Sequence, residues 1–190
     1  MNAVKTPMIG RMLQNITVAL FSIWMLTACG HNSKSEITSK LNNQLTRLSE
    51  NKSNNINTKS PIKLADSLRI SLSEYVELNP NDTLSATYLY ELAKINGDYF
   101  QNFHRSTDIL TQLIQKFPDH RLREDAWFLK GYTFNNYLNN TDSAKTTYEA
   151  YLKAYPNGEY AESAGFEIKS MEMSPEEMIR QFENQNSDSN

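Results

Sequence analysis

The hydrophobic pattern of the chain changes near Pro61. From there onward, apolar side chains recur at the three- and four-residue spacing of helices that bury one face. Polar turns interrupt the pattern, several of them at a proline, which ends a helix because it lacks the backbone N–H. The pattern predicts helices over 62–78, 84–95, 99–116, 121–138, 141–154 and 159–171. A last short helix begins at Ser174, where Glu177 completes a capping box.

The turns repeat at a fixed interval. Pro80, Pro118 and Pro156 lie 38 residues apart, and polar breaks at 96–98 and 139–142 divide the intervals into two helices each. Equal spacing in this range is typical of a solenoid, in which each repeat packs only on its neighbours. We therefore predict an all-α helix-turn-helix solenoid over residues 61–173, followed by a capping helix and frayed tail over 174–190.

The N-terminal segment has the pattern of a secretion signal. Lys5 and Arg11 precede an apolar run over residues 16–28. This run is shorter than a comfortable membrane-spanning helix, and its length suits the apolar region of a signal peptide. It ends at Leu26-Thr27-Ala28-Cys29, which resembles the lipobox of bacterial lipoproteins. The alternative is a membrane-spanning anchor with an incidental free cysteine.

The lipobox resemblance implies that residues 1–28 are removed and that Cys29 is acylated. More than one acyl chain gives lasting membrane attachment, at about 0.8 kcal/mol per buried CH2. Residues 29–60 are rich in Asn, Ser, Thr and Lys, which predicts a flexible polar tether.

Four apolar residues of the tether fall on one face of a possible short helix over residues 36–50: Ile37, Leu41, Leu45 and Leu48. This helix either is transient or docks on a surface, or it forms a short coiled coil. We favour the first interpretation, because two heptads fall short of the three or four that indicate a coiled coil. The oligomeric state stays open.

The third unit resembles the tetratricopeptide repeat, a helix-turn-helix motif with large and small residues at set positions. The matching residues are Trp127, Gly131, Phe134, Ala144, Tyr148 and Pro156. In the second unit Leu89, Ala93 and Pro118 match, whereas Ser106 replaces the usual Ala. The resemblance covers about residues 62–170. It implies a concave groove, lined by the first helix of each unit, that receives a peptide or partner protein.

The consensus register predicts the partner-binding residues of this groove. They are Tyr90, Lys94, Phe128, Tyr132, Asn135 and Phe166. Tyr90, Phe128 and Phe166 lie 38 residues apart and would form an aromatic ladder on successive helices. The alternative gives these aromatic residues to the core between repeats, because aromatic periodicity at helical spacing usually means packing.

A lipobox, a polar tether and long repeats occur together in related lipoproteins. The combination is similar to the outer-membrane assembly lipoprotein BamD and to the cell-division coordinator YbgF. This resemblance implies a location in the cell envelope, at the outer membrane and facing the periplasm. It also implies a role in outer-membrane protein assembly.

The net charge and the residue content limit the functions that we expect for the chain. The formal net charge is -3, and removal of residues 1–28 with Lys5 and Arg11 lowers it to -5, which argues against a nucleic-acid partner. The single cysteine excludes an internal disulfide. His31, His104 and His120 show no metal-ligand spacing, and no phosphate loop or nucleophile motif is present. We expect a non-catalytic adaptor without metal or cofactor. The alternative is an envelope enzyme or accessory subunit with an unrecognised site.

Overall fold

The computed structural model describes residues 34–52, 59–174, 176, 177 and 180 of the 190-residue chain. The chain divides into two units, Met1–Asn57 and Thr58–Asn190. In the first unit, residues 34–52 are helical, a range that includes the predicted segment 36–50. Leu41 and Leu48 of this helix are buried, whereas Ile37 is exposed. Oligomerisation through this helix stays a prediction.

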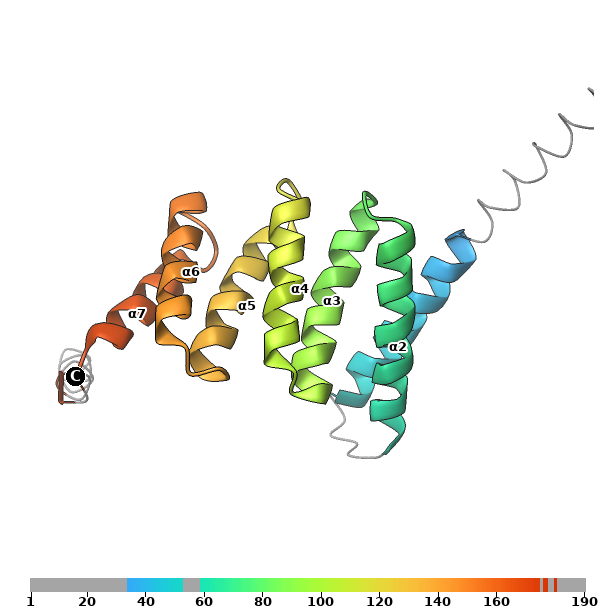
Figure 1. The fold of residues 1–190 in the computed structure, drawn as a ribbon, viewed down its shortest axis with the longest axis horizontal. Helices are drawn as coiled ribbons and strands as arrows, with labels where there is room; N and C mark the ends of the chain where they lie inside the picture. The colour runs from blue at the N-terminus through green and yellow to red at the C-terminus, as the bar shows by residue number, and fades with distance from the viewer. Residues whose placement is uncertain (1–33, 53–58, 175, 178–179, 181–190) are drawn as a thin grey trace, which may run out of the picture. The chain divides into compact units, whose positions relative to one another are not determined.

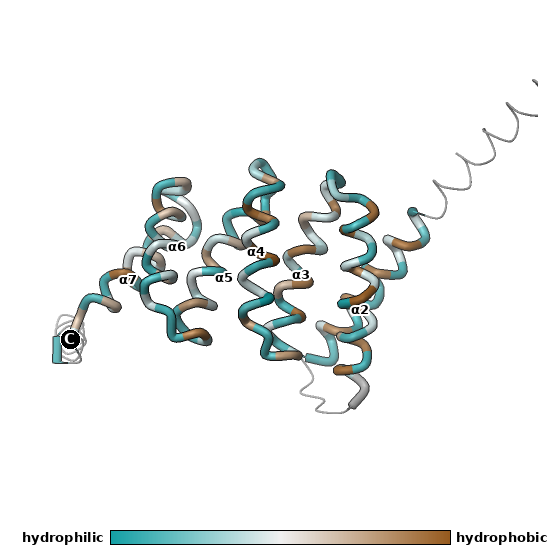
Figure 2. Tube along the Cα trace, viewed as in Figure 1, coloured by the Kyte–Doolittle hydropathy of each residue, from teal (hydrophilic) through white to brown (hydrophobic). Residues whose placement is uncertain are grey.

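Over residues 59–172 of the second unit, the helices α2 to α7 follow one another along the chain (Figure 1). Their bounds are α2 Lys59–Leu78, α3 Thr83–Phe100, α4 Phe103–Lys116, α5 Leu122–Asn136, α6 Thr141–Ala154 and α7 Ala161–Glu172. Each helix packs on the next one along the chain, and α3 also contacts α5. In Figure 2 apolar and polar positions alternate along each helix, as expected for helices that bury one face.

Short polar side chains begin three of these helices. Asp82, Asn102 and Asn140 accept hydrogen bonds from backbone N–H groups in the first turns of α3, α4 and α6. Such caps satisfy N–H groups that have no partner within the helix. The predicted capping box is also present, since Glu177 accepts from the Ser174 N–H and the Ser174 hydroxyl accepts from the Glu177 N–H.

Two predicted helix boundaries are wrong, the end of the helix 84–95 and the start of the helix 99–116, which begins at Phe103. The break expected at residues 96–98 does not occur, and α3 continues to Phe100. Asn96 is buried, and its side-chain amide donates to the carbonyl of Leu92, so it does not compete with the helix backbone. The helix ends instead at Gln101, which has φ 51° and whose N–H donates to the Gly97 carbonyl at 3.1 Å.

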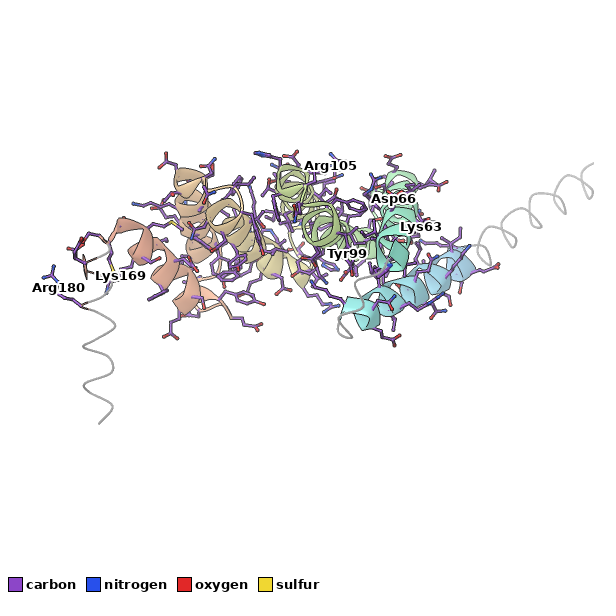
Figure 3. The ribbon with its side chains drawn as sticks, turned by 90° about the horizontal axis from the view of Figure 1, so that it is seen from below. Lys63, Asp66, Tyr99, Arg105, Lys169 and Arg180 are labelled. Atoms are coloured by element: carbon purple, nitrogen blue, oxygen red, sulfur yellow. The ribbon has the colours of Figure 1, made fainter. Side chains whose placement is uncertain are left out.

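The helices form two layers. Figure 3 shows α4 and α6 toward one side of the unit and α3, α5 and α7 toward the other. Because α3 contacts α5 directly, we call α3, α5 and α7 the inner helices and α2, α4 and α6 the outer helices. The α2–α4 part of the core is mainly aliphatic, with Leu68, Leu72, Leu89, Leu110 and Leu113 almost fully buried. The α5–α7 part is built around Tyr148 and Tyr151.

Candidate protein-interaction surface

The six residues predicted to line a groove all lie on inner helices. Tyr90 and Lys94 are on α3, Phe128, Tyr132 and Asn135 are on α5, and Phe166 is on α7. We call the surface that these helices carry the inner surface. Their environments differ from one another, and this difference decides which of them are available to a partner.

Tyr90 and Lys94 form a small polar cluster on α3. The Lys94 Nζ donates to both carboxylate oxygens of Glu91 at 3.1 Å and lies 5.5 Å from the centre of the Tyr90 ring. Burial, with the nearby carboxylates of Asp125 and Glu91, raises the pKa of Tyr90 to about 12. Tyr90 therefore carries a neutral hydroxyl at physiological pH, and the charge of Lys94 is balanced by Glu91.

Phe128 is packed into the core of the α5–α7 region. Its ring stacks on Tyr160 with centroids 4.5 Å apart and an interplanar angle of 15°. It also lies 5.6 Å from the Tyr148 ring and 6.4 Å from the Tyr151 ring. For this residue the structure agrees with the core-packing alternative. The aromatic ladder over Tyr90, Phe128 and Phe166 is thus not equally exposed along its length.

Tyr132 and Phe166 are more open to solvent, with exposed fractions of 37% and 58%. Between them, the Asn135 amide donates to the Glu167 carboxylate at 3.0 Å, which links α5 to α7. Exposed aromatic side chains on one face are typical of binding surfaces, because they lose water contacts when a partner covers them. Partner binding by the six residues stays a prediction.

A pocket of about 380 Å³ opens beside two of these residues, Lys94 and Tyr132. Its aromatic wall also includes Phe103, at the start of α4, and Tyr137, just after α5. The Phe103 and Tyr137 rings stack at 4.3 Å and 8°, and Tyr132 meets Tyr137 edge-on at 5.9 Å. Tyr137 is 50% exposed. The sequence interpretation missed Phe103 and Tyr137, because they lie at helix ends outside the register of the inner helices.

Residues 125–158, from α5 to the turn after α6, match a family model of the tetratricopeptide repeat. The fold is a tetratricopeptide-like helical solenoid. No curated protein matches the chain. Tetratricopeptide repeats commonly bind protein partners, and solenoids offer extended surfaces for this purpose. The repeat therefore indicates a role in protein–protein interaction.

Two histidines, His104 and His120, lie in the part of the chain that the structure describes. His104 is exposed on α4. The Nδ1 of His120 accepts from the N–H of Leu122 at 3.2 Å, and burial together with Arg121 lowers the pKa of His120. Across residues 34–52 and 59–174, no cluster of His, Cys, Asp and Glu has the arrangement of a metal site.

Cys29 lies outside the described residues. Within the part of the chain that the structure describes, no helix is long and apolar enough to cross a membrane.

Proposed function

We propose that this chain is a non-catalytic, lipid-anchored scaffold of the bacterial cell envelope that binds a partner protein or peptide on its inner surface. The observation that carries the proposal is the aromatic pocket between α3, α4 and α5. There, half-exposed Tyr132 and Tyr137 stand beside Lys94 on a tetratricopeptide-like solenoid.

The pocket suits a side chain of a bound peptide. Its volume of about 380 Å³ lies within the usual range for ligand pockets, and its aromatic wall supplies apolar contact area. Tyr132 and Tyr137 also carry hydroxyl groups that can bond to a peptide backbone, which is a common reason for tyrosine at interfaces. Phe128 does not line this pocket, and Tyr160 covers one face of its ring.

The proposed anchor depends on Leu26-Thr27-Ala28-Cys29. An acylated Cys29 followed by a polar tether would hold the solenoid near the membrane and leave its surfaces accessible. We propose the outer membrane, on the periplasmic side, as the location, and outer-membrane protein assembly as the process served. Both follow from the resemblance of the lipobox, tether and repeats to the BamD and YbgF lipoproteins.

The binding proposal is tested by the double variant Tyr132→Ala with Tyr137→Ala. Envelope proteins are cross-linked to the chain in intact cells and identified by mass spectrometry, and the purified variant is melted. We expect capture of the main partner to fall at least about tenfold, since truncation of a hot-spot aromatic costs roughly 2 kcal/mol or more. Stability should fall little, because both side chains are partly exposed.

Ile70→Ala is the matched control, because Ile70 is 58% exposed but lies on the outer helix α2. It should leave both capture and melting unchanged. Full capture by the double variant with a normal melting curve would show that this pocket does not bind the partner.

The anchor is tested separately by Cys29→Ser, which removes the acyl acceptor. The variant should keep its signal peptide and lose the mass of the acyl chains. A variant that matures to the mass of the parent protein and still fractionates with membranes would refute the lipoprotein proposal.

A further inference from the structure

A second hollow lies between α2, α3 and α4, with a volume of about 370 Å³. The outer helices α2 and α4 form its two walls, and the inner helix α3 forms its floor. We call it the outer groove. The tyrosine pocket of the inner surface uses other residues of α3 and α4, together with α5. The proposal for the outer groove therefore does not rest on the proposed inner-surface function.

One end of the outer groove is cationic. Arg69 from α2 and Arg105 from α4 both line it. Asp66 accepts from Arg69 Nη2 at 2.7 Å and from Nε at 3.3 Å, and the guanidinium lies 5.3 Å from the Phe100 ring. These contacts fix Arg69 and leave its Nη1 donors for a ligand. Figure 3 labels Arg105 on α4 and Asp66 on α2.

Arg105 differs from Arg69 in its pairing. Its side chain is exposed, and among the described residues no carboxylate or carbonyl group binds its guanidinium. A guanidinium presents several N–H donors in a planar fork that matches a carboxylate. Two arginines on facing helices therefore form a recognition point for an anionic group.

The other end of the groove is anionic, and the floor between the two ends combines buried apolar residues with polar side chains. Glu77 lines the groove eight residues after Arg69, about 12 Å farther along α2, and no described residue pairs with its carboxylate. Leu89, Leu92 and Ile109 lie between the two ends and are nearly fully buried. Ser73, Asn96 and Gln112 also line it, so the groove presents positive charge at one end, a mainly polar floor, and negative charge at the other end.

We propose that the outer groove binds an extended segment of a partner protein that carries an acidic and a basic side chain four residues apart. The carboxylate side chain lies between Arg69 and Arg105, the residues between cross the floor, and the basic side chain lies near Glu77. Five extended residues span about 13 Å, which matches the distance between the charged ends. Glu77 disfavours a purely anionic occupant such as a nucleic acid or an acidic lipid surface.

The test uses the full-length chain in detergent and two synthetic peptides, acetyl-Glu-Ala-Leu-Ala-Lys-amide and acetyl-Glu-Lys-Leu-Ala-Ala-amide, in which the two charges are adjacent. Each peptide is titrated to about 1 mM in a calorimeter, a range that detects binding free energies near 4 kcal/mol. Because the two peptides have the same composition, adsorption to detergent is the same for both. We expect the peptide with separated charges to bind at least about fivefold more tightly, because only this peptide can reach the arginines and Glu77 together.

Variants locate the binding. Arg105→Gln should weaken the preferred peptide at least about fivefold, whereas Lys116→Gln, which removes a charge from the other end of α4, should leave binding unchanged. Glu77→Gln should weaken the preferred peptide but not its analogue with Gln in place of Lys. Tyr132→Ala should have no effect, so failure of this proposal is distinguishable from failure of the inner-surface proposal. Arg105 and Glu77 are exposed, and melting curves confirm that their variants fold.

Three results would overturn the proposal. The first is equal binding, or no binding, of the two peptides up to about 1 mM. The second is an unchanged affinity in Arg105→Gln. The third is an unchanged affinity for the preferred peptide in Glu77→Gln.

Discussion

The α3–α4 pair and the α5–α6 pair occupy the same register of the solenoid but pack with different chemistry. At four positions, a Leu or Phe residue corresponds to a Tyr residue 38 positions later in the chain. The stretch from α4 to the first residue of α5 holds Leu110, Leu113, Phe117 and Leu122, and the stretch from α6 to the residue before α7 holds Tyr148, Tyr151, Tyr155 and Tyr160. Only the second set falls in the region that matches the tetratricopeptide repeat model, apart from Tyr160 just beyond its end.

The ring of Tyr148 on α6 requires a small residue at the facing position of α5, which is Gly131. A Cβ atom at Gly131 would lie 2.6 Å from Cε1 of Tyr148, which is too close for any side chain. In the α3–α4 pair the equivalent positions hold Ala93 and Leu110, both fully buried. A shorter aliphatic side chain on α4 is thus accompanied by a methyl group on α3. The combined size of the two facing residues is therefore similar in both helix pairs, although the residue at each single position differs.

Tyrosine also brings polar contacts that leucine lacks. The Tyr151 hydroxyl donates to Glu124 at 2.7 Å and accepts from the Tyr160 N–H at 2.9 Å. The Tyr160 hydroxyl donates to Asp125 at 2.9 Å. These bonds tie the turn after α6 to the start of α5. One backbone arrangement is thus stabilised by aliphatic packing in one repeat and by rings with a hydrogen-bond network in the next.

The largest effects should come from deleting the equivalent large side chains. Tyr148→Ala should lower the free energy of unfolding by roughly 3 to 5 kcal/mol and Leu110→Ala by roughly 2 to 5 kcal/mol, because both side chains are fully buried. Urea unfolding measures both values. The exposed Ile70→Ala should stay within about 0.5 kcal/mol of the parent protein. Equal stability of Tyr148→Ala and the parent would mean that the ring does not support this repeat.

A second prediction tests the size relationship directly. Gly131→Ala should destabilise by roughly 1 to 3 kcal/mol through overpacking against Tyr148. Adding Tyr148→Leu, which recreates the Ala–Leu pair of α3 and α4, should recover part of this loss. A double-mutant cycle then gives a coupling energy of about 1 kcal/mol or more between the two sites.

The control for this cycle is Gly165→Ala on α7. A Cβ atom there meets nothing within 4 Å, so this variant should gain up to about 1 kcal/mol from better helix propensity. Additive effects of Gly131→Ala and Tyr148→Leu would show that the two residues are not matched in size.

The sequence predicted much of this architecture, because its signals are local. The prolines at 80, 118 and 156 mark turns that the structure confirms, since each follows the end of an outer helix. The Asn96-Gly97 pair misled the prediction, because a buried Asn that bonds its own helix and a helical Gly leave the same sequence signal as a turn. The better signal was Asn102, which caps α4.

The candidate surface was less predictable. The 38-residue spacing assigned Lys94, Tyr132 and Phe128 to the same surface. In the structure, Lys94 and Tyr132 line the pocket, whereas Phe128 does not. The stacking of Phe128 on Tyr160 joins residues from a helix and a distant turn, and this contact depends on how α5 and α7 pack. The spacing of residues in the sequence does not predict this contact.

The third prediction concerns the tyrosine network. Tyr151→Phe should destabilise by roughly 1 to 3 kcal/mol, because it removes a hydrogen bond to the carboxylate of Glu124. Tyr148→Phe on the same helix should be nearly neutral, since its buried hydroxyl has no hydrogen-bond partner among the described residues. Equal losses in the two variants would show that ring polarity, and not the Glu124 contact, matters at these positions.

The same network predicts a dependence on alkaline pH. Burial, followed by the hydrogen bond to Glu124, raises the pKa of Tyr151 to about 12. A raised pKa means that the folded state favours the neutral phenol, so this contribution is complete below pH 10 and is lost as the pH rises toward 12. The stability difference between the parent protein and Tyr151→Phe should therefore narrow over this interval. Urea unfolding at pH 9 and pH 11.5 measures it.

The smallest predicted effects lie where the inner helices end. Gln101 after α3 and Asn139 after α5 are 38 residues apart, and both have positive φ, 51° and 49°. Side chains with a Cβ atom pay about 1 to 2 kcal/mol in this left-handed region, but Asn pays less because its short polar side chain bonds locally. Gln101→Gly should therefore raise the free energy of unfolding by about 1 kcal/mol, and Asn139→Gly should raise it less. Gln101→Asn should fall between the parent and Gln101→Gly. Thermal melts at matched concentration rank the variants, and a larger gain at Asn139 than at Gln101 would contradict this account of the two helix ends.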